Sequence, residues 1–387
     1  MKTIIFIGSN KSGSSREAIK AAERLGFFTI LLTDRELFLK NRLDFPDVHQ
    51  MVLTELTNNN LLKENIKAIQ AQGKKIEAIL SFIDPYVHVA AKLSKELDLT
   101  AVSPEPLANM EDKISTRELL RDLPVSPYFA RFKEGDSLED FIEKQKGFFP
   151  LIAKTPVSTG SKDVLFVKDE KQLAHSINNL LKKGSDEVLL EEYLEGPQYL
   201  IEACVYNGEV HVIAVLEQEI TFFERFIVTG YCLLGEMDIT FYNKIYKTVC
   251  LILERFEMNN GSCHLELRLI NNEWKLIEIN PRISGGAMNK IIEIGYGINL
   301  VEETIKIFLG QEPNFEKKHK KFVYAQYLTS HSTGRLIKVT GKNRCSRLPG
   351  VEEVFIKPKK GRICIHLYPW VTAMDMFWHL QRIKMKQ

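Results

Sequence analysis

Two glutamates on an expected β-hairpin carry the strongest chemical signal in the sequence. Residues 264–280 contain two runs of alternating apolar and polar side chains joined by a polar turn around Asn272, which is typical of a hairpin. With the turn centred on Asn272, residues whose numbers sum to 544 face each other, so Glu266 lies opposite Glu278. Opposed side chains lie ~5 Å apart, and two carboxylates repel at that distance. A positive group should therefore lie between them.

Alternation along the strands sorts the hairpin into two faces. The apolar face, which we expect to pack on a core, contains Leu265, Leu267, Leu269, Ile277 and Ile279. The polar face contains His264, Glu266, Glu278 and Asn280. Carboxylate and amide oxygens with phosphate oxygens are the ligands that Mg²⁺ prefers, and Mn²⁺ is an alternative. Glutamates that merely point into water from a half-exposed sheet are the competing interpretation.

The residues after the second strand favour a functional site over an exposed sheet. Arg282 follows Asn280 and Pro281 directly, and the pair Gly285-Gly286 comes shortly afterwards. An arginine is therefore placed at the end of a strand beside a flexible loop. Ligands commonly bind at such strand ends in α/β folds.

The elements that must position these residues begin with a β-α-β pattern in the first hundred residues. Apolar runs expected to form strands alternate with amphipathic runs expected to form helices: strands 3–7, 27–32 and 76–82, and helices 15–25, 61–72 and 85–97. This alternation predicts a parallel sheet covered by helices. The Gly/Ser loop of residues 8–14 invites a nicotinamide-binding interpretation, but its spacing is not G-x-G-x-x-G.

The pattern changes after Pro104 and Pro106. We expect a helix at 109–121, a buried strand at 147–154 that ends in Lys154, a small-residue loop at 158–162, a strand at 164–167, a helix at 173–183 and a strand at 187–193. The region from 200 to 280 is rich in strand patterns, including 199–206 and 209–216, with one helix around 243–257.

Composition limits the class of protein. The chain has 387 residues, of which 44% are hydrophobic and 26% charged, so it can form two or three domains with cores. No stretch approaches the ~18 apolar residues of a membrane span, and the N-terminus lacks the cleavage region of a signal peptide, so we expect a cytoplasmic protein that needs no membrane. The six cysteines form no C-x-x-C pair and are expected to be reduced.

Charge is distributed unevenly along the chain. Residues 311–387 hold 16 Lys and Arg against 5 Asp and Glu, a charge of +11, so the rest of the chain carries −9 of the overall +2. A net charge this small gives no reason to expect a nucleic-acid partner, and a basic segment is usually a solvated face. It is also compatible with docking of an acidic protein.

Six motifs occur in order along the chain: Glu-Asp-Lys-x-x-x-Arg (111–117), the strand-end Lys154, the loop 158–162, Glu-Glu-Tyr-Leu-Glu-Gly (191–196), His-x-Glu (264–266) and Glu-x-Asn-Pro-Arg-x-x-Gly (278–285). With these motifs the sequence resembles the ATP-grasp superfamily of carboxylate-amine ligases. The resemblance implies an α/β chain in which a Rossmann-like parallel sheet precedes an ATP-grasp domain of two α+β subdomains and a small extension. The implied boundaries are 1–106, 107–310 with a lid subdomain at about 125–192, and 311–387.

Within the superfamily the chain looks most like the bacterial L-amino-acid ligases, which join two amino acids. The segment 334–351 is similar to their C-terminal extension. This resemblance implies small-molecule amino acid substrates, and we expect a homodimer because dimers are the commonest oligomers of soluble proteins.

The resemblance also implies roles in binding ATP. Lys113 and Lys154 would contact the phosphates, and the loop with Ser158, Ser161 and Lys162 would close over them. Glu191, Glu192, Tyr193 and Leu194 would form the hinge that reads the adenine. Family members usually carry a glutamate for the ribose hydroxyls where this chain has Gln198, which can hydrogen-bond but has no charge.

The remaining implied roles concern the cation and the substrates. Glu266, Glu278 and Asn280 resemble the magnesium ligands of the superfamily. Arg282 would hold the substrate carboxylate and stabilise developing charge, and Gly285 and Gly286 would let the substrate approach. Asp84 is either a residue near the substrates or a helix cap.

One departure bears on specificity. Dipeptide-forming relatives commonly show Glu-Thr-x-His where this chain has Val228-Thr229-Gly230-Tyr231, so Tyr231 would contact a different amino acid, or the nucleophile is not a free amino acid.

The implied reaction is phosphoryl transfer to a carboxylate followed by attack of an amine on the acyl phosphate. Three alternatives stay open: an ATP-grasp ligase that acylates an acidic carrier protein or another metabolite, a nucleotide-binding regulatory module without turnover, and a nicotinamide oxidoreductase.

Overall fold

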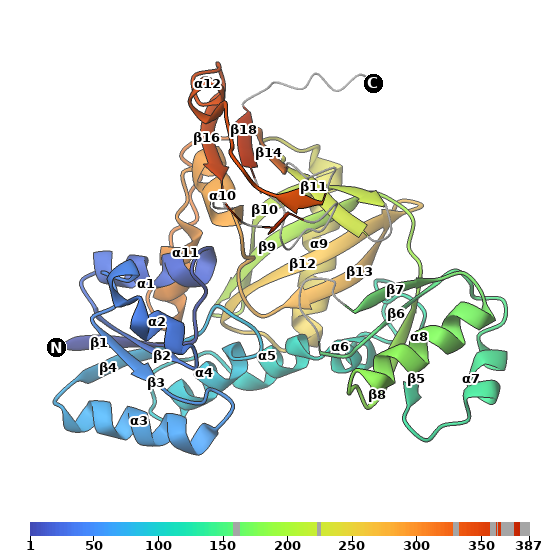
Figure 1. Ribbon diagram of the computed structural model, residues 1–387, viewed down its shortest axis with the longest axis horizontal. Helices are drawn as coiled ribbons and strands as arrows, with labels where there is room; N and C mark the ends of the chain where they lie inside the picture. The colour runs from blue at the N-terminus through green and yellow to red at the C-terminus, as the bar shows by residue number, and fades with distance from the viewer. Residues whose placement is uncertain are drawn as a thin grey trace.

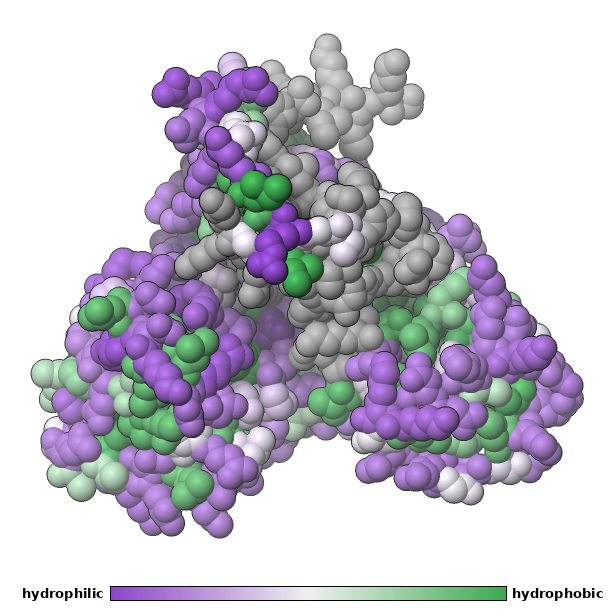
Figure 2. Space-filling view, in the orientation of Figure 1, coloured by the Kyte–Doolittle hydropathy of each residue, from purple (hydrophilic) through white to green (hydrophobic). Residues whose placement is uncertain are grey.

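The computed structural model describes residues 1–157, 163–222, 226–327, 333–356, 361, 363–364 and 375–379. Three lobes surround a central region: the N-terminal lobe, a second lobe that follows it, and a large sheet that completes the molecule (Figure 1). Hydrophilic side chains dominate the visible faces of the first two lobes, with hydrophobic ones in small groups (Figure 2). Within the described residues, no helix is both long and apolar enough to cross a membrane.

A four-stranded parallel sheet in the order β3-β2-β1-β4 forms the N-terminal lobe. Its elements are β1 (Lys2–Ile7), α1 (Ser14–Arg24), β2 (Phe28–Thr33), α2 (Glu36–Lys40), the 3-10 turn Arg42–Asp44, β3 (Gln50–Leu53), α3 (Asn59–Ala71), β4 (Lys75–Leu80) and α4 (Val87–Lys95). Ile4 and Phe6 of β1 share a core with α1, whereas Ile5 and Ile7 share a core with α3. Helices therefore cover both faces, and the predicted covered parallel sheet is confirmed.

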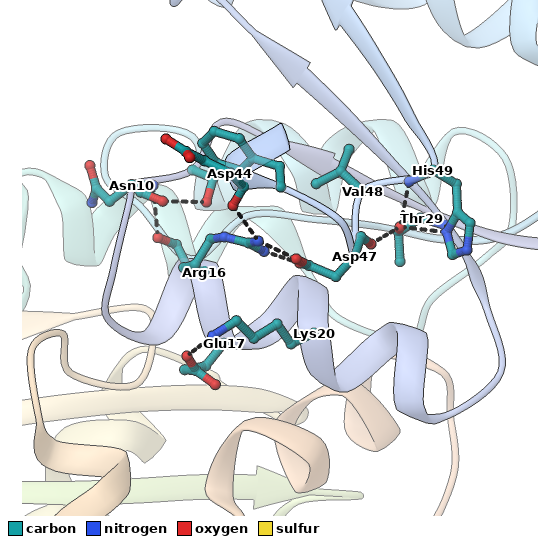
Figure 3. Close-up of polar contacts among 12 residues, drawn as sticks. Asn10, Arg16, Glu17, Lys20, Thr29, Asp44, Asp47, Val48 and His49 are labelled. Atoms are coloured by element: carbon teal, nitrogen blue, oxygen red, sulfur yellow. Dashed lines mark hydrogen bonds and ion pairs between the residues drawn. The ribbon is translucent and has the colours of Figure 1, made fainter. Parts of the chain in front are cut away.

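A buried ion pair anchors the start of α1. The Arg16 guanidinium binds the Asp47 carboxylate, and both residues are almost completely buried (Figure 3). The contact joins α1 to the segment that precedes β3, so the Gly/Ser loop of residues 8–14 enters the helix at a fixed position. At Gly13, which has φ +85°, a Cβ would lie 3.3 Å from the backbone nitrogen of Gly286. The loop thus lies directly against the segment that follows Arg282.

Two short helices connect the first lobe to the second. They are α5 (Pro104–Glu111) and α6 (Lys113–Leu119), so the prediction of one helix over 109–121 is wrong. The chain becomes extended at Asp112, whose side chain accepts a hydrogen bond of 2.6 Å from the Ser115 backbone N–H and caps α6. This break makes Lys113 the first residue of α6.

The second lobe is an antiparallel sheet in the order β5-β8-β6-β7 with two helices on it. Its elements are β5 (Phe129–Lys133), α7 (Leu138–Lys144), β6 (Leu151–Lys154), β7 (Val164–Val167), α8 (Glu170–Lys182) and β8 (Glu187–Glu192). The strand patterns predicted β6, β7 and β8. β5 was not predicted, because its sequence, FARFK, mixes charged and apolar residues.

The third lobe contains an eight-stranded sheet in the order β13-β12-β9-β10-β11-β14-β18-β16. Its strands are β9 (Gln198–Tyr206), β10 (Glu209–Phe222), β11 (Phe226–Leu233), β12 (Gly261–Ile270), β13 (Glu273–Asn280), β14 (Val323–Tyr327), β16 (Val351–Ile356) and β18 (Asp375–His379). The remaining elements are α9 (Ile239–Arg255), α10 (Met288–Tyr296), α11 (Leu300–Phe308), α12 (Lys342–Cys345) and the pair β15 (Gly334–Arg335) and β17 (Ile363–Cys364). Strands from residues 311–387 thus extend this sheet. The domain boundaries given above stay predictions.

The register of the β12–β13 hairpin agrees with the prediction where the polar residues lie. Glu266 pairs with Glu278, and His264 pairs with Asn280. The carboxylates are therefore on neighbouring strands and on one face, as expected.

Nearer the turn the register shifts by one residue, because the turn contains two residues and a bulge follows. Asn271 and Asn272 both have positive φ, which suits a two-residue hairpin turn. Leu267 then pairs with Leu276, and Ile277 is the extra residue. The expectation that Ile277 packs on the apolar core is wrong: Leu276 is fully buried there, and Ile277 lines a cleft beside Glu278.

Candidate active site

Glu266 and Glu278 line a cleft between the second and third lobes. Gln198 Nε2 on β9 donates a 2.9 Å hydrogen bond to Glu266 Oε2, and Lys113 Nζ lies 3.4 Å from Glu278 Oε1. Burial, and then the nearby charge of Glu278, raise the pKa of Glu266 to about 7. When both carboxylates are ionised they repel each other, and the positive charge around them does not fully offset this repulsion. A divalent cation bound between them would remove it.

His264 orients Asn280 and the backbone of Arg282. Burial, and then the charge of Arg282, lower the pKa of His264 to about 4, so its ring is neutral at pH 7. His264 Nδ1 lies 2.9 Å from the Arg282 carbonyl oxygen, which can only accept, so Nδ1 carries the hydrogen. Nε2 must then accept from the side-chain nitrogen of Asn280, 3.2 Å away. The side-chain oxygen of Asn280, the atom suited to a cation, takes no part in this contact.

A buried cluster of three charged residues lies at the other end of the cleft. Glu191 Oε1 accepts from Arg117 Nε at 2.6 Å, and Glu191 Oε2 lies 2.6 Å from Lys154 Nζ. All three residues are at most 5% exposed. Burial alone would raise the pKa of Glu191, but Arg117 and Lys154 outweigh it and lower the pKa, so Glu191 is ionised. Arg117 also donates to the backbone oxygens of Leu276 and Ile277, which ties α6 to the hairpin.

We expect Glu191→Ala to destabilise the protein strongly. The change leaves the cations of Arg117 and Lys154 buried without their counter-charge, which typically costs about 3–5 kcal/mol. Urea unfolding followed by fluorescence measures this free energy. The matched control is Asp122→Ala, which removes the exposed ion pair with Arg255 and should barely move the midpoint. Equal stability of the Glu191→Ala and Asp122→Ala variants would contradict this interpretation.

The hinge residues lie at the end of β8 and directly after it, at the edge of the cleft. Glu192 accepts at Oε1 from the Tyr128 backbone N–H, 3.0 Å away. Leu194 offers its carbonyl oxygen to Arg268 Nη1, and Arg268 Nε donates to Gln198 Oε1 at 2.9 Å. Arg268 thus connects the hinge to Gln198, and Gln198 in turn contacts Glu266.

Aromatic rings line the same part of the cleft. Tyr193 packs edge-on against Phe166, with ring centroids 4.8 Å apart, and stacks on Phe226 at 6.0 Å. Tyr193 and Phe226, together with Ile220 and Val228, give this part of the cleft an apolar wall, and Phe166 packs against the two rings. Such a wall beside backbone hydrogen-bonding groups suits a planar ring.

Arg282 at the end of β13 is held by Asp84, which follows β4 of the first lobe. Arg282 Nε lies 3.1 and 2.9 Å from the two Asp84 carboxylate oxygens, and Nη2 contacts the same carboxylate. The contact is side-on, and Arg282 Nη1 donates to the carbonyl oxygen of Ile283 at 3.2 Å. Asp84 does not cap α4, whose first N–H groups are satisfied by Glu111. The helix-cap alternative for Asp84 is therefore excluded, and its place near the substrates stays a prediction.

The other predicted site residues are placed as follows. Gly285 and Gly286 are exposed, and no atom lies within 4 Å of a Cβ built on either, so the loop leaves open space. Tyr231 contacts Gln218 of the cleft and packs edge-on against Tyr327, with centroids 5.7 Å apart. Ser158, Ser161 and Lys162 lie outside the described residues.

Sequence reasoning assigned no role to several residues that the structure brings to the cleft. Arg117 stood in a quoted motif, and its helical spacing from Lys113 could have signalled a shared face. Arg268 lies between two leucines on β12, as Glu266 does, whereas Gln218 lies between Glu217 and Glu219 and carries no such signal. Among the described residues, no group of three or more His, Cys, Asp or Glu side chains forms a metal cluster. The candidate cation ligands are accordingly two carboxylates and one amide.

Comparison with known proteins agrees with this geometry. A family model of an ATP-grasp domain matches residues 147–290, and a model of an ATP-grasp N-terminal domain matches residues 19–100. The L-arginine-specific L-amino acid ligase of Bacillus subtilis is 20% identical over 373 residues, which cover 94% of this chain and 89% of that protein.

Solved structures share the fold. The L-amino acid ligase from Bacillus licheniformis aligns with a TM-score of 0.82 at 20% identity, covering 99% of this chain and 94% of that one. The biotin carboxylase domain of the Hydrogenobacter thermophilus 2-oxoglutarate carboxylase, solved with MgADP, aligns with a TM-score of 0.70 at 14% identity, covering 98% and 86%. The hairpin carboxylates, the hinge and both family models lead to one conclusion: the chain belongs to the ATP-grasp superfamily of carboxylate-amine ligases.

Proposed function

We propose that this protein joins two amino acids by an amide bond, using ATP to activate one carboxylate as an acyl phosphate and releasing ADP and phosphate. The observation that carries the proposal is the placement of Arg282. It ends the strand that bears Glu278 and Asn280, and Asp84 holds it side-on next to an open glycine loop. The relatives named as L-amino acid ligases support the choice of amino acids as substrates.

The cleft supplies groups suited to each part of ATP. Lys113 and Lys154 would contact the phosphates, since each projects from the end of an element into the cleft. The backbone of Tyr193 and Leu194 would read the adenine edge against the aromatic wall. Gln198 is held by Arg268 and Glu266, so it would offer the ribose hydroxyls only its remaining hydrogen-bonding capacity. We retain Ser158, Ser161 and Lys162 as the proposed phosphate loop.

Glu266, Glu278 and Asn280 would hold Mg²⁺, or Mn²⁺ in its place. Their oxygens suit a hard cation, and the crowding of the two carboxylates fits a site that accepts positive charge. When bound, the ion neutralises phosphate charge during phosphoryl transfer. The relative solved with MgADP supports this nucleotide and ion.

The chain's own residues would do three things during the reaction. Arg282 would bind the substrate carboxylate and stabilise the negative charge that develops when the amine attacks. Asp84 would hold the side chain of Arg282 in position, and His264 would hold its backbone. The lobe that carries Lys154 would exclude water, because an acyl phosphate hydrolyses.

We expect binding of the cation to weaken as pH falls. Without a cation the pKa of Glu266 is raised to about 7, so its carboxylate is protonated below that pH and must lose a proton to bind the ion. Affinity for Mn²⁺ in the presence of a non-hydrolysable ATP analogue should therefore fall up to about tenfold per unit below pH 7 and level off above it. Electron paramagnetic resonance titrations at pH 6, 7 and 8 measure this. Equal affinity at all three values would contradict the prediction.

The activity is tested by a pairwise matrix of the twenty amino acids. Phosphate release is measured for every pair, and mass spectrometry identifies the products. We expect at least one pair to give ADP, phosphate and a dipeptide in equal amounts. ATP binding without hydrolysis for every pair would instead indicate a regulatory nucleotide-binding module.

A second candidate function is acylation of an acidic carrier protein by the same chemistry. It is favoured by the charge of +11 on residues 311–387 and by Val228-Thr229-Gly230-Tyr231, which departs from the polar segment of dipeptide-forming relatives. An acidic carrier protein added to the same assay distinguishes the two, because the acyl group then appears on the protein. The homodimer stays a prediction that sedimentation can test.

A further inference from the structure

One buried carboxylate beside the site has no part in the roles above. Glu202 lies in the middle of β9, opposite His264 of β12, and none of its surface is exposed. The Ser284 backbone N–H donates to the two Glu202 carboxylate oxygens at 3.1 and 3.3 Å, and the Ser284 hydroxyl donates to the same carboxylate. Ser284 is itself buried and stands two residues after Arg282.

Stability alone gives little reason for a carboxylate at this place. Removing an ionisable group from water is costly, and among the described residues the hydrogen-bond donors to Glu202 are the two of one serine, with no ion pair to a cation. Burial accordingly raises the pKa of Glu202 to about 7. A smaller apolar residue would fill a strand interior without this cost, so the contact with Ser284 needs another explanation.

The position of the contact between Glu202 and Ser284 supplies an explanation. The loop of residues 281–286 runs from the end of β13 toward α10, and its two glycines have no side chains with which to hold it, although the backbone of Gly286 lies against Gly13. His264 fixes the loop at the carbonyl of Arg282, and Glu202 fixes it at Ser284. The two side chains stand opposite each other on adjacent strands, so the sheet holds the loop at two points.

We propose that Glu202 is a positioning residue for ligation, which sets the position of Arg282 and the glycine loop at the substrate by holding Ser284. This inference rests on the proposed function of Arg282. Displacement of a group that binds a reacting substrate by about 1 Å can cost about 10²-fold in rate. Glu202 contacts neither the nucleotide cleft nor its hinge, so its effect should be confined to the amino acid substrate.

The test compares Glu202→Ala with Glu202→Gln in the full chain, using the amino-acid pair that gives most product in the matrix. We expect Glu202→Ala to lower kcat/KM for the activated amino acid by about 10²-fold while the KM for ATP stays unchanged. Glu202→Gln should recover most of the loss, because its side-chain oxygen can still accept from Ser284. The control is Glu303→Gln on α11, at another buried carboxylate, which accepts from the Asn314 backbone N–H and also pairs with Lys306. It should leave kcat/KM unchanged.

Hydrogen exchange gives a readout that needs no substrate. The amide of Ser284 should exchange faster in Glu202→Ala than in the wild type, with little change in β12 and β13. If the wild type turns over no pair, the proposed function fails, and exchange alone decides whether Glu202 holds the loop. Unchanged exchange at 281–286 would overturn the inference. An equal loss of kcat/KM for ATP and for the amino acid would also overturn it, as would a Glu202→Ala variant with wild-type kcat/KM.

Discussion

Replacement of Arg282 by alanine is expected to lower turnover of the best amino-acid pair by about 10² to 10³, the usual cost of losing one well-placed donor that stabilises developing charge. The side chain is held side-on by Asp84, so its removal also leaves that carboxylate with its charge uncompensated. Arg282→Lys should recover little, because an ammonium cannot bind two partners in the planar geometry of a guanidinium. Phosphate release with saturating ATP measures the effect.

Two further measurements make this result specific. Circular dichroism and the affinity for a non-hydrolysable ATP analogue should match the wild type, since Arg282 lies beyond the nucleotide cleft. Arg24→Ala is the matched control, because it removes an exposed arginine that also binds a carboxylate side-on, that of Glu302. Near-wild-type turnover in Arg282→Ala would show that the substrate site lies elsewhere.

Replacement of Glu278 by alanine is expected to lower ligation by at least about 10², because the ion that neutralises the phosphates loses a ligand. Glu278 also lies 3.4 Å from Lys113 Nζ, so the same variant removes this ion pair. Glu278→Gln separates the two effects, since the amide keeps the size and one oxygen but not the charge. Both variants are assayed by phosphate release across a series of Mn²⁺ concentrations.

Glu273→Gln is the control for Glu278, because Glu273 is an exposed carboxylate at the far end of the same strand. It should leave turnover and its dependence on Mn²⁺ unchanged. We expect a high Mn²⁺ concentration to restore part of the turnover of Glu278→Gln and almost none of the turnover of Glu278→Ala. A Glu278→Ala variant with normal turnover at low Mn²⁺ would mean that Glu278 is not a cation ligand.

The parts of the fold that depend on local patterns could be predicted from the sequence. The alternation of apolar runs and helices predicted the covered parallel sheet, and the polar turn at 271–272 predicted the β12–β13 hairpin. The pairing of Glu266 with Glu278 was predicted although the turn was assumed to be one residue longer. The bulge at Ile277 compensates for that difference, and no local signal such as glycine marks it.

The contacts that complete the site could not be predicted, because they join residues far apart in the sequence. Asp84 and Arg282 are 198 residues apart, and Glu191 and Arg117 are 74 residues apart. In the sequence alone, each of these four residues could be an ordinary exposed charge. Only the packing of the lobes shows that the two members of each pair are in contact. The family resemblance suggested that Asp84 lies near the substrates, whereas its contact with Arg282 emerged from the structure.

The C-terminal strands illustrate a second limit. A basic segment rich in charged residues is usually a solvated face, yet β14 and β16 are part of the large sheet. In β14, Val323, Ala325 and Tyr327 are buried while the residues between them are half-buried. This alternation is too short to separate from chance in a single sequence.

We propose that Glu266 and Glu278 together hold the divalent cation of the nucleotide. A crystal structure with a non-hydrolysable ATP analogue and Mn²⁺, the metal located by its anomalous signal, tests this most directly. We expect one anomalous peak between the two carboxylates, about 2.1 Å from an oxygen of each, with the triphosphate on its other side. A metal peak away from both glutamates, with the nucleotide bound, would contradict the claim.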